Sequence, residues 1–213
     1  KVRLQMLKLF GGLLKASAHR TSICGRPDKP RILLIRPDHL GDVLLTLPAV
    51  GALRKALPEA HLTMMVGPWS KEIVERDHLL DELQTCPFPG FVRAHAGSLL
   101  AAYGTLWETS KRVRRGSYDA ALVLRYDHWW GAFMAALAGI PLRVGCGTPE
   151  CSPFINYPVA IAGRIHWARQ ALGIVDKLLS IWGADPLKAL EPLQLRFPIA
   201  VDESRAADRL WSE

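Results

Sequence analysis

The feature that most constrains the fold is a regular alternation of short apolar runs with longer segments of helical periodicity. The apolar runs have the length of buried strands, and proline and glycine separate them from the helical segments. Parallel strands need a crossover connection, which a helix usually supplies. The alternation therefore predicts an α/β domain built from βαβ units around a mostly parallel sheet.

The expected elements follow from these runs. We expect strands at 31–36, 61–66, 83–86, 118–124 and 142–145. We expect helices at 43–57, 69–77, 98–115, 129–138 and 167–182. Pro48 marks the start of the main part of the first helix, after an irregular turn, and Pro58 ends it.

The chain divides into three parts. Its 213 residues suit one domain plus extensions. We assign 1–30 to a leader and 31–184 to the domain. Proline-containing pairs after Gly183 indicate a linker within 185–213, which ends in a helical pattern that the chain end interrupts.

The leader carries most of the net charge of +7, with seven basic side chains and one acidic one. The domain itself is therefore not strongly basic, and no nucleic-acid partner is expected. Residues 1–15 have the pattern of a basic amphipathic helix, with an apolar stripe formed by Val2, Met6, Leu9, Phe10 and Leu13. This pattern predicts peripheral contact with an anionic membrane. The alternatives are a helix docked on the protein's own core and a signal peptide.

Composition excludes several classes. No apolar run approaches the roughly 18 residues that a membrane-spanning helix needs. The four cysteines are scattered, which argues against a disulfide framework, and they have no zinc-site spacing. The sequence therefore predicts a cytoplasmic protein without a metal site.

The loop after the first predicted strand, 36–42, is the first candidate site, because ligands of open α/β sheets bind beyond the carboxyl ends of the strands. Gly41 allows a tight turn and close approach of a ligand. Asp42 lies at the start of the following helix, where an ionised carboxylate can act as a general base. The alternative is that Asp42 only caps the helix. His39 is carried as a binding candidate, although a lone histidine is more often structural.

Two arginines lie near other strands that share this edge. Arg125 follows the fourth predicted strand, and Arg143 lies in the fifth. Either guanidinium could hold a carboxylate or a phosphate through forked hydrogen bonds. The alternative for each is a surface arginine or a structural ion pair.

Missing motifs narrow the chemistry. The sequence has no phosphate-binding loop and no Gly-x-Ser-x-Gly nucleophile elbow. It also has no His-Glu-x-x-His motif and no Asp-x-Asp pair that could hold a divalent metal on a sugar diphosphate.

Three segments together resemble a known family. Residues 31–58, RILLIRPDHLGDVLLTLPAVGALRKALP, are similar to the opening of glycosyltransferase family 9, the ADP-heptose:lipopolysaccharide heptosyltransferases. The pattern is a strand, an arginine, Gly-Asp, an apolar stretch, Thr-x-Pro-Ala and a helix. Residues 118–125, YDAALVLR, and 137–145, LAGIPLRVG, also match the layout of the family.

The resemblance implies a GT-B enzyme with two Rossmann-like domains, in which the amino-terminal domain binds the acceptor and the other binds a nucleotide-sugar donor. It implies transfer of a heptose-type sugar, with inversion, from an ADP-heptose-like donor to a lipopolysaccharide inner-core or related anionic glycolipid, and no further cofactor. Asp42 matches the family's general base and Arg36 a basic acceptor-binding position. Arg125 and Arg143 match more loosely.

The length departs from the family pattern. Two Rossmann-like domains need more than about 300 residues. We therefore expect this chain to be the acceptor half, with 185–213 as the linker and the start of a truncated donor-binding domain, and to be inactive alone. The rival interpretation is a non-catalytic Rossmann-like binding module at the membrane surface. A reading frame that continues beyond Glu213 would favour the enzyme.

Overall fold

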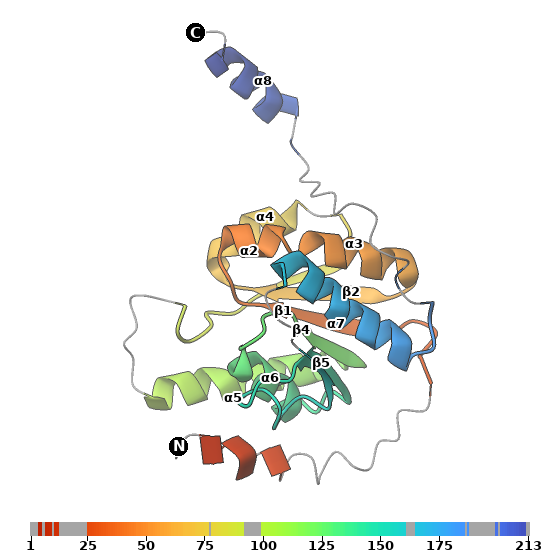
Figure 1. Cartoon of the computed structure of the whole chain (residues 1–213). Coiled ribbons are helices and arrows are strands. Elements are labelled where there is room, and N and C mark those ends of the chain that lie inside the picture. The colour runs from red at the N-terminus through yellow and green to blue at the C-terminus, as the bar shows by residue number, and fades with distance from the viewer. Residues whose placement is uncertain are drawn as a thin grey trace.

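The computed structural model describes residues 4–5, 7–9, 11–12, 25–76, 78–91, 99–160, 165–185, 187, 199 and 201–211. Its centre is a six-stranded, all-parallel sheet in the order β3-β2-β1-β4-β5-β6 (Figure 1). The strands are β1 Arg31–Arg36, β2 His61–Val66, β3 Glu82–Thr85, β4 Ala120–Val123, β5 Leu142–Cys146 and β6 Tyr157–Val159. The predicted α/β class and parallel sheet are confirmed.

Helices cover both faces of the sheet (Figure 1). The elements on one face are α2 Leu40–Leu44, α3 Leu47–Ala56, α4 Lys71–Glu75 and α7 Trp167–Ile181, with the short 3-10 helix η1 Pro68–Ser70 before α4. The other face carries α5 Leu99–Arg115 and α6 Trp129–Leu137. Helix α8, Val201–Trp211, follows the linker region and buries none of its residues.

The central strands are apolar on both sides, as a sheet between two helical layers requires. In β1, Ile32 and Leu34 pack in the core with α3 and α7, whereas Leu33 and Ile35 pack in the core with α5 and α6. Successive side chains of a strand point to opposite faces, so one short run supplies both cores.

The predicted elements match the structure closely, with one strand missed. The first predicted helix is two helices, and Pro48 lies in the first turn of the second. The missed strand is β6, which contains Pro158 and pairs only with β5 at the edge of the sheet. A proline lacks the backbone donor, so it is tolerated in an edge strand but weakens the sequence signal for one.

The described residues of the leader between 4 and 12 are helical and contact the domain. Leu7 is buried with the side chains of α5 and α6, and a Cβ on Gly11 would lie within 2.4 Å of Pro153. This is the docked helix of the sequence analysis, whereas Leu9, from the predicted apolar stripe, is exposed. The other stripe residues lie outside the described residues. Within the described part of the chain, no helix is long and apolar enough to cross a membrane.

Candidate functional site

The strand order reverses direction between β1 and β4. The chain runs from β1 outward to β2 and β3, then returns to β4 on the other side of β1 and continues to β5 and β6. The loops after β1 and β4 therefore leave the same edge of the sheet and diverge, and ligands of open α/β sheets bind at such a switch point. The candidate site lies at this edge.

An ion-pair network joins the two loops. Arg36, the last residue of β1, places Nε 2.9 Å from Oδ2 of Asp38 and donates from Nη1 to the carbonyl oxygen of Leu124 at 2.5 Å. The other carboxylate oxygen of Asp38 accepts from Nη1 of Arg125. Arg125 also donates from Nε to Oδ1 of Asp127 at 2.6 Å. Asp38 therefore lies between the two guanidinium groups and ties the β1 loop to the β4 loop.

The two arginines of this network differ in how far their side chains are buried. Arg36 and Asp38 are each 2% exposed, whereas Arg125 is 29% exposed. Burial lowers the pKa of Arg36, although the carboxylates of Asp38 and Asp42 act in the opposite direction. Burial would also lower the pKa of Arg125, but its hydrogen bonds and ion pairs with Asp127 and Asp38 outweigh it and raise that pKa.

Asp42 lies in the first turn of α2, three residues after the N-cap residue His39. Its side chain is partly exposed, and it makes no hydrogen bond or ion pair with any residue that the structure describes. Asp42 is not the N-cap residue of α2, because that position belongs to His39. Asp42 nevertheless lies close enough to Arg36 to influence its pKa. The carboxylate thus lies partly exposed at the carboxyl edge of the sheet.

An aromatic wall stands beside the network. Trp69, after β2, donates from Nε1 to the carbonyl oxygen of Asp38 at 2.9 Å, and Ser70 Oγ donates to the same oxygen at 3.0 Å. Gly67 is required here, because a Cβ at that position would lie 2.0 Å from the indole. Phe91, after β3, stacks with Trp69 at a centroid distance of 6.2 Å.

The wall extends to the polar groups on either side. The His39 ring lies 5.5 Å from that of Trp69, and the Arg125 guanidinium lies 5.2 Å from the Phe91 centroid. Loops after four neighbouring strands thus contribute to one group of side chains. Such partly exposed rings beside a carboxylate are suited to contact the face of a sugar.

The structure brings some predicted site residues together and separates others. His39, Gly41, Asp42 and Arg125 share this edge and are exposed or partly exposed. Arg36 shares it but is buried, so it holds the loops rather than facing a ligand. The expectation that Arg36 contacts the acceptor directly does not fit this burial.

Arg143 is placed elsewhere. It pairs with Ala121, three residues before Leu124 along β4, which sets it about 10 Å from the carboxyl edge. The guanidinium is buried and donates from Nε to the carbonyl oxygen of Phe154 at 2.7 Å and from Nη1 to that of Ile140. Burial lowers its pKa to about 10. Of its two interpretations in the sequence analysis, the structural one fits this geometry.

Sequence reasoning missed Asp38, Asp127 and the aromatic wall. A signal for the two carboxylates was present, because Arg-x-Asp-His occurs at the ends of both central strands, as 36–39 and 125–128. Trp69 and Phe91 had no such signal, since their place depends on how the loops after β2 and β3 fold back.

Other reactive side chains do not join the site. The three described cysteines, Cys86, Cys146 and Cys151, are free and buried, and burial raises the pKa of each to about 11. A thiol in that state is a poor nucleophile near neutral pH. In the part of the chain that the structure describes, no three His, Cys, Asp or Glu residues gather as metal ligands.

The comparisons with known proteins agree on the fold. No protein-family model and no curated protein sequence matches the chain. Solved structures do. The ADP-heptose lipopolysaccharide heptosyltransferase II of E. coli has a TM-score of 0.65 and 18% identity over 85% of this chain and 50% of its own. A family 9 glycosyl transferase from Veillonella parvula has a TM-score of 0.67 and 20% identity over 88% and 50%.

A third match carries a ligand. E. coli heptosyltransferase WaaC with ADP-2-deoxy-2-fluoro heptose has a TM-score of 0.61 and 17% identity over 78% of this chain and 52% of its own. The resemblance stated from the sequence is therefore confirmed at the level of fold, as a Rossmann-like α/β domain shared with these glycosyltransferases. The chain spans about half the length of the structures that it matches.

Proposed function

We propose that this chain is the acceptor-binding half of an inverting glycosyltransferase of the family 9 type. The observation that carries the proposal is the carboxylate of Asp42, which forms no ion pair with a described residue, at the switch-point edge of a domain with the fold of heptosyltransferases. The donor is a nucleotide sugar of the ADP-heptose class, and the acceptor is a lipopolysaccharide inner-core or related glycolipid. The ADP-heptose analogue in the WaaC structure supports the choice of donor.

In the proposed reaction, Asp42 takes the proton from an acceptor hydroxyl as the oxygen attacks the anomeric carbon. The new bond forms on the face opposite the diphosphate, the bond from the anomeric carbon to the diphosphate oxygen breaks, and the configuration inverts. The nucleoside diphosphate leaves with the electron pair of that bond. Stabilising its charge falls to the donor half, which corresponds to the portion of the similar structures that this chain does not cover.

The charges at the carboxyl edge of the sheet indicate which part of the acceptor would bind there. The group contains three carboxylates, Asp38, Asp42 and Asp127, against the guanidinium groups of Arg36 and Arg125. These residues therefore have no excess of positive charge at the place where the reacting hydroxyl would lie. An uncharged sugar ring against Trp69 and Phe91 fits this balance better than a phosphate does. Anionic groups of the acceptor would be held further away.

The test uses a longer protein that contains the donor half, with ADP-heptose as donor and an inner-core glycolipid as acceptor. Asp42→Asn keeps the size of the side chain but cannot accept the proton, so kcat should fall by about 10²–10⁴. Glu72→Gln, in the first turn of α4, is the matched control and should retain the parental rate. Parental transfer by Asp42→Asn would overturn the proposal.

The proposal also covers where the protein lies in the cell and how the transfer assay separates the enzyme from a non-catalytic binding module. We propose a cytoplasmic protein whose residues 1–15 also contact the membrane, with Leu7 and Gly11 docked on the domain. The chain without its donor half is expected not to transfer sugar. If the longer protein also transfers none from ADP-heptose while both variants melt like the parent, the non-catalytic binding module is the better account.

A further inference from the structure

Helix α5 exposes aromatic and basic side chains together. Tyr103 is 52% exposed and Trp107 is 55% exposed, although large aromatic side chains usually have most of their surface covered. Lys111 is one turn beyond Trp107, and its Nζ lies 5.2 Å from the indole centroid. Residues four apart lie on one face of a helix, so these three side chains form a single exposed stripe.

The last two turns of α5 are strongly basic. They carry Lys111, Arg112, Arg114 and Arg115, and the only acidic residue of the helix is Glu108, which pairs with Lys111 at 3.3 Å. Arg112 donates to the carbonyl oxygen of Thr85, and Arg114 donates to those of Leu137 and Ala138. Hydrogen bonds to neutral carbonyls orient these guanidinium groups without cancelling their charge.

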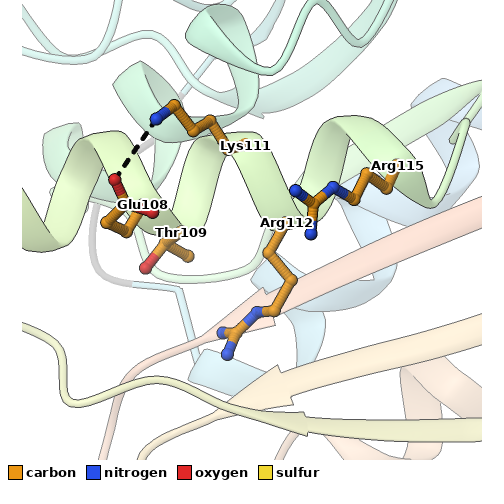
Figure 2. Close-up of a pocket in the computed structure, with 5 residues that line it drawn as sticks. All are labelled: Glu108, Thr109, Lys111, Arg112 and Arg115. Atoms are coloured by element: carbon orange, nitrogen blue, oxygen red, sulfur yellow. Dashed lines mark hydrogen bonds and ion pairs between the residues drawn. The ribbon is translucent and has the colours of Figure 1, made fainter.

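A pocket lies within this basic region. Its volume is about 290 Å³, and it is lined by Glu108, Thr109, Lys111, Arg112 and Arg115 (Figure 2). In Figure 2, Arg112 reaches from the helix toward the sheet, while Lys111 points away from it toward Glu108. Arg115 forms no ion pair with the residues that the structure describes. The pocket therefore has an excess of positive charge and suits a phosphate.

The leader adds to the same side of the molecule. Its helical segment packs through Leu7 into the core shared with α5 and α6, and Figure 1 places it beside that layer. Leu9 of this segment is 66% exposed, and Lys8 next to it is also exposed. This layer thus presents apolar and basic side chains from two elements, whereas the opposite layer mixes Lys71 with Glu72 and Glu75 on α4.

We propose that the outer face of α5, together with the leader segment, binds the surface of an anionic phospholipid bilayer. Tyr103 and Trp107 enter the headgroup region, where amphipathic aromatic rings are favoured. The cations at the end of α5 attract the anionic headgroups, and the pocket takes a lipid phosphate. Such binding is independent of sugar transfer, and it adds helix α5 to the membrane contact proposed for residues 1–15.

The combination of side chains favours a bilayer over a nucleic acid. The cations gather at one end of α5 and the aromatic side chains lie in its middle, whereas a nucleic-acid groove interleaves them along a backbone track. Exposed aromatic side chains beside lysine and arginine are typical of a helix at a membrane interface.

The test measures co-sedimentation of the 213-residue chain with vesicles of phosphatidylglycerol and phosphatidylcholine, and with vesicles of phosphatidylcholine alone. The parent should bind the anionic vesicles and lose affinity as salt rises. Lys111→Glu with Arg115→Glu should weaken this binding by about tenfold or more, since each basic residue near the surface contributes a factor of about five. Lys55→Glu with Lys177→Glu, on the opposite layer, is the control of equal charge and should bind like the parent.

A second measurement addresses the aromatic side chains. Trp107→Phe should lose part of the fluorescence quenching by lipids with brominated acyl chains, whereas Trp167→Phe, on the opposite layer, should not. Equal binding of the α5 and control variants would overturn the proposal, as would equal binding to both kinds of vesicle. Tighter, α5-dependent binding of a DNA duplex would also overturn it and assign the surface to nucleic acid. Far-ultraviolet circular dichroism verifies that each variant is folded.

Discussion

The same tetrapeptide, Arg-x-Asp-His, ends both central strands, yet the two copies are buried in opposite senses. In the copy at 36–39, the arginine and the aspartate are each 2% exposed, and the histidine faces solvent. In the copy at 125–128, the arginine is 29% exposed and the aspartate 40%, while the histidine is buried.

The neighbouring loops explain the reversal. The first copy lies under the loop after β2, whose Trp69 and Ser70 donate to the backbone of Asp38. In the second copy, the arginine is only partly covered, by Phe91, whose ring centroid lies 5.2 Å from the guanidinium, and the histidine lies against Phe88 at a centroid distance of 5.1 Å. The same arginine, aspartate and histidine at the same spacing therefore give a structural anchor in one loop and a partly exposed charged group in the other.

The largest expected effect separates the two aspartates. Asp38→Ala leaves the buried Arg36 guanidinium without its carboxylate, and breaking a buried pair in this way typically costs about 3–5 kcal/mol. Asp127→Ala removes a partly exposed partner of Arg125 and should cost at most about 1 kcal/mol. Urea denaturation of both variants checks the difference. Equal losses would mean that burial does not distinguish the two copies.

The second prediction concerns the histidines. His128 has no hydrogen-bond partner for either ring nitrogen among the described residues, and burial lowers its pKa from 6.5 to about 3. The unfolded chain therefore binds the proton first, so stability is complete above pH 6.5 and falls as the pH drops toward 3. The loss should reach about 2 kcal/mol at pH 5, because one pKa unit corresponds to about 1.4 kcal/mol.

Two variants isolate that contribution. His128→Leu removes the titrating group and should flatten the dependence of unfolding free energy on pH between pH 5 and pH 6.5. His39→Leu, at the exposed histidine of the other copy, is the matched control and should keep the parental dependence. A parental slope in His128→Leu would show that other groups cause the acid destabilisation.

The comparison of the two copies shows which features of the fold the sequence can predict. Short apolar runs predicted β1, β2, β4 and β5, because a strand buried on both faces must be apolar throughout. They also predicted that Asp42 and Arg125 share an edge, because the carboxyl ends of parallel strands meet there. Both results follow from local pattern and topology alone.

Exposure could not be predicted in the same way. Arg36 and Arg143 have the local sequence of candidate binding residues, but each ends up buried, with its guanidinium donating to carbonyl oxygens of distant loops. Those oxygens come from residues 88 and 11 positions away in the chain. Which arginine stays exposed is thus decided by tertiary packing, which local sequence does not determine.

The third prediction compares glycines that follow the two tetrapeptides. A Cβ on Gly131, in α6, would lie 2.4 Å from Nδ1 of His128 and 3.0 Å from Cγ2 of Ile35. Gly131→Ala should therefore destabilise the fold by about 1–3 kcal/mol, as overpacking of a core does. Thermal melting checks it, with Gly173→Ala in α7 as a helix control that has open space at its Cβ. Combining Gly131→Ala with His128→Ala should cost less than the sum of the two single losses, since the closest contacts of the added Cβ are with the His128 ring.

The smallest expected effect is at Gly41, the glycine that follows the first copy. It lies in α2, a Cβ added to it would have no atom within 4 Å, and it is not among the residues of positive φ. Gly41→Ala should leave stability unchanged or raise it by up to about 1 kcal/mol, because alanine loses less backbone entropy in a helix. The domain itself therefore does not require a glycine here, and any requirement must come from a ligand.

If the acceptor approaches the backbone beside Asp42, Gly41→Ala in the longer protein should raise the acceptor KM more than it lowers kcat. Parental kinetics in a stable variant would place the acceptor elsewhere along the edge, toward Trp69 and Phe91.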